Sequence, residues 1–213
     1  MALLDSLADD PTPVLRWYRS TTPAIVLGRG QRETLLQGRD LRAVEVVGRF
    51  SGGGAVLMDD GLLSADIVVP AGHPLAAGDI GAIFERVGEA WAAALADLGV
   101  EEVAVHRGPA TARRRGSPRE QLLAAVCYAT LGRGEVTVGG RKLVGLSQRR
   151  RAPGALVQCG LLRRWRPGPL LEALGADPDD AEIRDAAVGL DDLVADPPDD
   201  AAIMAAVRRR VVG

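Results

Sequence analysis

Hydrophobic and polar residues follow two kinds of spacing along this chain, one typical of strands and the other typical of helices. Short apolar runs bounded by glycine, proline or polar residues predict strands. Such runs cover residues 14–19, 24–27, 44–47, 62–69, 102–106 and 155–162. Residues 79–98 instead place apolar side chains at helical spacing, with Asp79 able to cap the start and Gly99 able to end the helix. The mixture predicts an α+β fold with a mixed, largely antiparallel sheet and flanking helices.

Shorter helices are expected near both ends of the chain. Residues 2–9 place leucines on one face of a short helix, and a helical turn is expected near residues 35–41. Beyond Pro167 the composition shifts, and short helices are predicted over residues 170–175, 179–187, 189–195 and 199–212. We therefore expect two units, a main domain over residues 1–165 and a small helical C-terminal extension over residues 166–213.

A β-hairpin is predicted where two apolar runs flank Gly139 and Gly140, because glycine supplies the positive φ angles that tight hairpin turns need. Lys142 lies just past this turn on the second strand, and it is the only lysine among the 26 basic residues. Its ammonium is a compact point charge that can reach a single carbonyl or phosphate oxygen. Lys142 is therefore a candidate catalytic residue, and the alternative is a leftover surface lysine.

Three consecutive glycines between two predicted strands form a second candidate site. They are Gly52, Gly53 and Gly54. Without Cβ atoms, the backbone amides of such a stretch can approach a ligand closely. Arg49 and Ser51 add a cation and a hydroxyl donor beside this glycine loop. An anion or a carbonyl group is the expected ligand, and a tight turn or bulge is the alternative.

Composition and charge narrow the class of protein. With 213 residues, 47 % hydrophobic content and a net charge of −2, the chain is typical of a globular protein with a sizeable core, and its charge does not favour nucleic acid. No apolar run reaches the roughly 20 residues of a membrane span. The two cysteines, Cys127 and Cys159, are too few for a disulfide scaffold. We expect a cytoplasmic monomer that binds neither nucleic acid nor membrane and has no dedicated metal site.

Three motifs together resemble the lipoate–protein ligase A family, whose catalytic domain is shared with biotin–protein ligases and octanoyltransferases. The motifs are Arg49-Phe50-Ser51-Gly52-Gly53-Gly54-Ala55-Val56-Leu57-Met58-Asp59, Lys142-Leu143-Val144-Gly145-Leu146-Ser147-Gln148-Arg149 and Val157-Gln158-Cys159-Gly160. Their order and spacing are similar to the family pattern over roughly residues 1–165. The resemblance implies the biotin/lipoate–protein ligase fold for this part of the chain.

The resemblance also implies a reaction, in which a lipoyl or octanoyl group is attached to a lysine of a small carrier domain. The acceptors would be the lipoyl domains of 2-oxoacid dehydrogenase E2 subunits or the glycine cleavage H protein, and an acyl carrier protein is a further partner. In such enzymes the lysine at the position of Lys142 contacts the acyl carbonyl, where its charge stabilises the oxyanion that develops during attack. Alternation along the strands would place sheet residues such as Val56 and Val144 along an aliphatic tunnel for the acyl chain.

The other motif residues are expected to contact substrate or nucleotide. The resemblance places Arg49 near a phosphate and the glycine loop along the acyl or nucleotide pocket. The residues in this binding set are Arg49, Ser51, Gly52, Gly53, Gly54, Asp59, Gly145, Ser147, Gln148 and Arg149.

The chain departs from the family pattern at three places. The paired arginines of the family become Gly48-Arg49, and two family histidines become Met58 and Cys159. We also expect the chain to lack the additional C-terminal domain of larger ligases. These departures bear on how the acyl group is activated, so three interpretations stay open.

The first interpretation is an ATP-dependent ligase that forms an acyl-adenylate with Mg²⁺ and passes lipoate to the acceptor. The two longest motifs favour this interpretation.

The second interpretation is an octanoyltransferase that acts through a thioester on Cys127, because the octanoyltransferase branch has a cysteine about fifteen residues before the family lysine. A thiolate beside a cation such as Arg133 or Lys142 is a strong nucleophile, whereas a small buried hydrophobe is the alternative for Cys127. Cys159, inside a strand, is interpreted as structural. The third interpretation is a relative that binds a lipoyl-like ligand without turnover.

Overall fold

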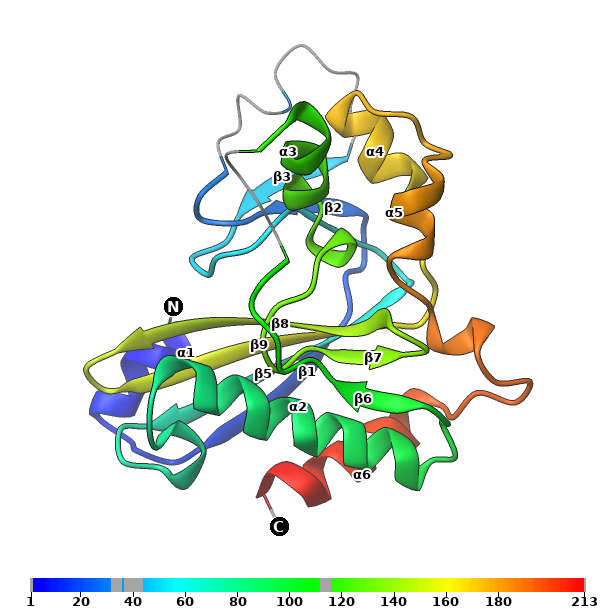
Figure 1. Cartoon of the computed structure of the whole chain (residues 1–213). Helices are drawn as coiled ribbons and strands as arrows, with labels where there is room; N and C mark the ends of the chain where they lie inside the picture. The colour runs from blue at the N-terminus through cyan, green and yellow to red at the C-terminus, as the bar shows by residue number, and fades with distance from the viewer. Residues whose placement is uncertain (1, 32–35, 37–43, 112–115, 213) are drawn as a thin grey trace.

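The computed structural model describes residues 2–31, 36, 44–111 and 116–212 and divides their strands between two sheets (Figure 1). The larger sheet has six strands, all paired antiparallel, in the spatial order β1 (Val14–Tyr18), β5 (Leu62–Pro70), β9 (Gly154–Leu162), β8 (Arg141–Arg151), β7 (Val136–Val138) and β6 (Val103–Val105). The smaller sheet has the order β3 (Glu45–Gly48), β2 (Ala24–Leu27) and β4 (Val56–Met58). In it β2 is parallel to β3 and antiparallel to β4. The predicted α+β fold is confirmed, with its strands in two sheets.

Helix α2 (Ile80–Asp97) lies along one face of the larger sheet, and α6 (Asp200–Val212) packs beside it (Figure 1). The start of α2 is capped as predicted, because the Asp79 carboxylate accepts a hydrogen bond from the backbone nitrogen of Ala82 at 2.7 Å. Gly99 adopts a φ of +83° just beyond its end. Trp91 of α2 is fully buried in the main core, which also contains Ile203 of α6. The helical periodicity therefore identified a core face.

The smaller sheet has helices of its own (Figure 1). These are α3 (Pro118–Ala125), α4 (Gly168–Leu174) and α5 (Ala181–Asp185). A second core cluster joins Ile25 and Leu27 of β2 to Leu170 and Leu171 of α4 and to Ile183 of α5. A third, smaller cluster forms where the sheets meet; its fully buried members are Val56, Leu62, Tyr128, Leu162 and Ala187. The glycine loop and the lysine strand thus come from different sheets.

The predicted hairpin is confirmed, with β7 and β8 joined through Gly139 at φ +56° and Gly140 at φ +79°. The 154–162 strand pairs with β8, as expected for a third strand of the same sheet. The register between β7 and β8 shifts by one residue between Val136 and Thr137. Such a bulge turns side chains locally and ends regular pairing. β8 continues well beyond β7, and this extension passes the candidate site.

The helices expected after residue 167 are present as α4, α5, the 3-10 helix η5 (Leu190–Asp192) and α6. The early helix is short, with α1 (Ala2–Asp5) followed by η1 (Ser6–Ala8); another 3-10 turn, η3 (Pro74–Ala76), precedes α2. Apart from residue 36, the turn expected near residues 35–41 lies outside the described residues. The C-terminal helices pack on both halves of the molecule, α4 in the second core cluster and α6 against α2.

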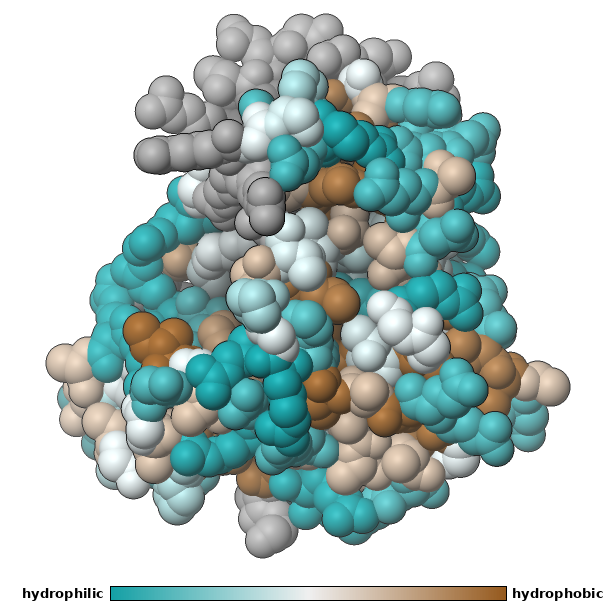
Figure 2. Space-filling model, in the orientation of Figure 1, coloured by the Kyte–Doolittle hydropathy of each residue, from teal (hydrophilic) through white to brown (hydrophobic). Residues whose placement is uncertain are grey.

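On the face shown in Figure 2, hydrophilic and hydrophobic residues are interspersed. In the part of the chain that the structure describes, no helix has the length and apolar character required to cross a membrane.

Candidate active site

Backbone hydrogen bonds fix Cys127 against the end of the glycine loop. Cys127 begins the 3-10 helix η4 (Cys127–Ala129), directly after α3. Ala55 N donates to Ala125 O at 2.6 Å, and Cys127 N donates to Ala55 O at 2.9 Å. Two motifs that lie far apart in the sequence therefore hold each other in place.

Gly54 is required at this junction for steric reasons. A Cβ on Gly54 would lie 2.6 Å from Cys127 N and 2.9 Å from Ala125 O, whereas a Cβ on Gly52 would meet nothing within 4 Å. We expect Gly54→Ala to lower the free energy of unfolding by about 1–3 kcal/mol, because the backbone bridge must move apart. The matched variant Gly52→Ala should stay within about 0.5 kcal/mol of the parent. Urea denaturation measures both values, and equal effects would show that Gly54 is not crowded.

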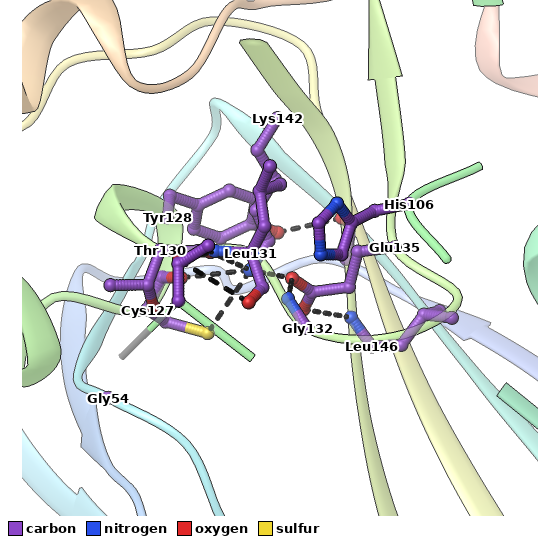
Figure 3. A network of polar contacts seen from close by, with 12 residues as sticks. Gly54, His106, Cys127, Tyr128, Thr130, Leu131, Gly132, Glu135, Lys142 and Leu146 are labelled. Atoms are coloured by element: carbon purple, nitrogen blue, oxygen red, sulfur yellow. Dashed lines mark hydrogen bonds and ion pairs between the residues drawn. The ribbon is translucent and has the colours of Figure 1, made fainter. Parts of the chain in front are cut away.

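Lys142 is buried at the centre of the site, with 1 % of its surface exposed. Its backbone is held by the C-terminal part of the chain, since Lys142 N donates to Ala186 O at 2.9 Å and Val188 N donates to Lys142 O at 3.0 Å. The side chain passes the ring of Tyr128, with Nζ 5.1 Å from the ring centroid (Figure 3). The alternative of a leftover surface lysine is therefore wrong.

The Lys142 ammonium makes three short polar contacts. Nζ donates to Cys127 O at 2.8 Å and to Thr130 O at 3.1 Å, and it lies 2.7 Å from Oε2 of Glu135 (Figure 3). Glu135 is buried too, with 4 % of its surface exposed. Sequence analysis did not select Glu135, although an acidic residue next to the first strand of the lysine hairpin was a usable signal. The lysine and the glutamate form a buried ion pair directly behind Cys127.

Two cations lie at the same distance from the Cys127 thiol. Lys142 Nζ is 4.0 Å from Sγ, and Nη2 of Arg49 is also 4.0 Å from Sγ. The Arg49 guanidinium is held by the glycine loop, because Nη2 donates to Gly52 O at 2.8 Å and to Gly54 O at 3.0 Å. Both charges attract a thiolate at Cys127. Arg133 does not join them, contrary to expectation; its Nε donates to Glu85 at 2.8 Å on α2.

A cavity of about 80 Å³ opens beside the thiol between the two sheets. Its lining includes apolar residues from both sheets together with several polar residues. They are Tyr18, Val26, Arg49, Val56, Met58, Leu62, Ser64, Cys127, Tyr128, Gly145, Leu146, Ser147, Gln158, Cys159 and Gly160. Val56 lines the cavity as expected. The expectation for Val144 is wrong, because Val144 points into the main core and the neighbouring Gly145 faces the cavity.

A chain of hydrogen-bonded polar side chains runs beside the cavity. Ser147 Oγ donates to Ser51 Oγ at 3.0 Å, and Ser51 Oγ donates to Oε1 of Gln158 at 2.8 Å. The amide nitrogen of Gln158 in turn donates to Asp66 at 3.4 Å. Ser51 of the first motif thus connects Ser147 of the second motif to Gln158 of the third, and Ser147 and Gln158 line the cavity.

Of the ten residues in the expected binding set, Arg49, Gly145 and Ser147 line this cavity, and the other seven do not. Asp59 accepts a hydrogen bond from Gly61 N at 2.8 Å in the turn between β4 and β5. Gln148 lines a neighbouring surface groove that also contains Gly52, Gly53 and Ile80. Arg149 Nη1 donates to Phe50 O at 3.4 Å. Within the described ranges, no group of three or more His, Cys, Asp or Glu side chains is arranged to hold a metal ion.

Burial separates the two cysteines chemically. Burial raises the pKa of Cys159 to about 12, and its side chain lies with Trp91 in the main core. Cys127 is only partly buried and faces the cavity. Burial also raises the pKa of Tyr128, whose hydroxyl donates to Gly160 O at 2.7 Å. Cys159 and Tyr128, which also line the cavity, therefore remain neutral near pH 7.

The chain resembles curated proteins of one kind. It is 36 % identical over 161 residues to the octanoyltransferase LipM of Moorella thermoacetica, a match that covers 74 % of this chain and 56 % of that protein. Identity to the octanoyltransferase LipM of Carboxydothermus hydrogenoformans is 32 % over 153 residues, covering 70 % of this chain and 52 % of the relative. The chain thus spans about half the length of the curated relatives it matches.

Solved structures and a family model give the fold and the family. A putative lipoate protein ligase from T. acidophilum with bound lipoic acid has a TM-score of 0.68 at 19 % identity, covering 98 % of this chain and 76 % of that chain. A lipoate-protein ligase A bound with ATP has the same TM-score at 20 % identity and the same coverage. The model of the lipoyl protein ligase A/B catalytic domain matches residues 1–209. This chain therefore belongs to the lipoyl protein ligase A/B catalytic-domain family.

Proposed function

We propose that the protein transfers an octanoyl or lipoyl group from a thioester donor to a lysine of a carrier domain, through a thioester on Cys127. The main support for this proposal is the position of the Cys127 thiol. The thiol faces a largely apolar cavity and lies 4.0 Å from both Lys142 Nζ and Arg49 Nη2. The matched relatives named octanoyltransferase support the same reaction. The cavity would hold the acyl chain, with its carbonyl carbon at the thiol.

The proposed reaction has two acyl transfers. The Cys127 thiolate attacks the carbonyl carbon of the donor thioester, the bond to the donor sulfur breaks, and the donor thiol leaves with the proton that Cys127 gave up. The neutral amine of the acceptor lysine then attacks the Cys127 thioester. An amide bond forms, and Cys127 leaves with a proton from the amine. The donor thioester already carries the activation, so neither step needs ATP.

The two cations have different tasks in this proposal. Both offset the negative charge of the thiolate, and the same charges favour the oxyanion that develops on the acyl oxygen. Arg49 acts from the glycine loop, where two carbonyl groups hold it. Lys142 acts from β8 of the larger sheet, with Nζ 4.0 Å from the thiol. The fixed positions of both groups avoid reorganisation during the reaction.

The ligase interpretation, which the sequence motifs placed first, is the weaker candidate. The curated relatives that the chain matches at 36 % and 32 % identity are named octanoyltransferases, and this supports transfer from a thioester over adenylation. The fold-similar lipoate ligases share 19 % and 20 % identity with this chain, which establishes a common fold. The assay described below includes lipoate, ATP and Mg²⁺ in one arm, so that it also tests the ligase interpretation.

The proposed partners follow from the reaction. An acceptor needs an exposed lysine on a small domain, and we propose the lipoyl domains of 2-oxoacid dehydrogenase E2 subunits and the glycine cleavage H protein. An archaeal lipoylation system of similar fold has been solved as a ligase with its E2 lipoyl domain. An acyl carrier protein is the proposed octanoyl donor. Two free cysteines are compatible with a cytoplasmic location, which we also propose.

A two-arm transfer assay tests the proposal. One arm contains the protein, an apo lipoyl domain and octanoyl thioester of acyl carrier protein without ATP; the other contains lipoate, ATP and Mg²⁺. We expect modified lipoyl domain in the thioester arm alone, read by mass spectrometry. Modification that depends on ATP would establish the ligase instead. Unmodified acceptor in both arms would establish the binding protein without turnover.

A further inference from the structure

The three protons of the Lys142 ammonium are matched by three acceptors in this structure. An ammonium has three donors and no acceptor. Glu135 Oε2 lies 2.7 Å from Nζ, Cys127 O lies at 2.8 Å and Thr130 O at 3.1 Å. Two of the three acceptors are backbone carbonyls of the loop that carries the thiol. Lys142 is therefore bound to the backbone of the candidate nucleophile as well as to a counter-charge.

Glu135 is itself fixed by backbone donors from two segments. Leu146 N of β8 donates to its Oε1 at 3.1 Å, and Gly132 N donates to its Oε2 at 2.7 Å (Figure 3). Its side chain is 6 % exposed and that of Lys142 is 2 % exposed. Glu135 lies just before Val136, the first residue of β7. Leu146 lies in the part of β8 that extends beyond β7, and its backbone nitrogen there donates to the Glu135 carboxylate. This arrangement leaves the carboxylate little freedom to turn.

A buried ammonium is stable only with compensation, because removing a charge from water costs several kcal/mol. Glu135 is the acidic residue in ion-pair contact with Lys142. Without it, the buried ammonium would have no counter-charge and would be displaced from the site. The contacts to Cys127 O and Thr130 O would then be lost or weakened.

We propose that Glu135 is the positioning residue of the site, holding Lys142 as an ammonium against the loop that carries Cys127. It touches neither the cavity nor the thiol, and it acts through Lys142. During acyl transfer, the longest of the three contacts, to Thr130 O, is the one that Lys142 exchanges for the acyl oxygen. The catalytic part of this inference rests on the proposed function; the structural part does not.

The single lysine of the chain makes a direct test available. Selective ¹⁵N-lysine labelling places one side-chain signal in the NMR spectrum, that of Lys142 Nζ. In the parent near pH 7 we expect a visible ammonium correlation whose protons exchange slowly with water, because all three are hydrogen-bonded in a buried site. In Glu135→Gln we expect the signal to disappear or to exchange at least tenfold faster. The matched control Glu85→Gln removes a carboxylate that pairs with Arg133 on the surface, and it should leave the signal unchanged.

The outcomes separate the inference from its alternatives. A Glu135→Gln protein that retains the parent's slow exchange would overturn the positioning role. If Glu135→Gln does not fold, the parent spectrum decides alone, since exchange as fast as that of free lysine would show that Nζ is not held.

Activity gives a second and separable readout. In the thioester arm of the assay, Glu135→Gln should lower kcat on the order of 100-fold with KM changed less than about threefold, because the group that is misplaced acts on the reacting centre and leaves substrate binding in place. A change confined to KM would contradict the catalytic part. If the parent shows no transfer in either arm, the proposed function fails, while the NMR result still tests the Lys142–Glu135 arrangement.

Discussion

Replacing Cys127 with alanine is expected to reduce octanoyl transfer to the lipoyl domain by roughly 10³-fold or more, down to background. The thiol is the only nucleophile among the cavity-lining residues that both adjacent cations approach at 4.0 Å. Its removal eliminates the covalent intermediate, and the proposed mechanism supplies no other route. Modified acceptor, quantified by mass spectrometry under initial-rate conditions, gives the comparison.

The matched control for this experiment is Cys159→Ala, which also removes one thiol. The Cys159 side chain lies in the main core with Trp91, and burial raises its pKa to about 12. We expect this variant to keep Cys127-dependent transfer, with a loss of stability of about 1 kcal/mol from the deleted sulfur. Transfer that persists in Cys127→Ala and is lost in Cys159→Ala would reverse the assignment of the two cysteines.

Replacing Lys142 with methionine is expected to affect both stability and activity. The substitution keeps the length of the side chain but leaves Glu135 as a buried charge without its partner, which costs about 3–5 kcal/mol of unfolding free energy. The rate of transfer should fall at least about 100-fold, because a charge aimed at the developing oxyanion is lost. Urea denaturation and the thioester assay measure the two effects.

The double variant Lys142→Met with Glu135→Gln distinguishes these effects. Once both partners are neutral, no uncompensated charge remains, so at least half of the lost stability should return. Activity should not return, since the ammonium is still absent. A double variant that is less stable than Lys142→Met alone would show that Glu135 contributes to stability mainly through its bonds to Leu146 N and Gly132 N.

Much of the fold could be predicted from local pattern. The Gly139-Gly140 turn, the Asp79 cap and the apolar face of α2 are each set by neighbours in the sequence, and all three are confirmed. The division of strands into two sheets could not be predicted in this way. Alternation tells which strands are buried, and it does not tell which strand each one pairs with.

The same distinction between local pattern and long-range contacts applies to the candidate site. Lys142 and the glycine loop were identified because rare residue types stand out in a sequence. Glu135 was missed because it is one of 28 acidic residues, and its place beside the first strand of the hairpin, the one usable signal, was not weighed. The register shift next to Val136 also explains why alternation assigned Val144 to the cavity, where the structure has Gly145. A bulge changes which side chains face inward, and periodicity does not reveal it.

The C-terminal part of the chain has a role at the site that its composition did not suggest. The segment after α5 hydrogen-bonds both backbone groups of Lys142, through Ala186 O and Val188 N. Residues 166–213 were predicted as a small extension. In the structure, this part of the chain is hydrogen-bonded to β8 at Lys142. Contacts between segments this far apart in sequence arise from tertiary packing, which local patterns do not report.

Intact-mass measurement of the purified protein after mixing with octanoyl thioester, without acceptor and without ATP, tests the central claim most directly. We predict that the parent gains the mass of one octanoyl group, that the gain is absent in Cys127→Ala, and that adding apo lipoyl domain returns the protein to its original mass as the acceptor becomes modified. A parent that never gains mass while the acceptor is still modified would contradict the Cys127 thioester, and an adduct that persists in Cys127→Ala would place the acyl group elsewhere.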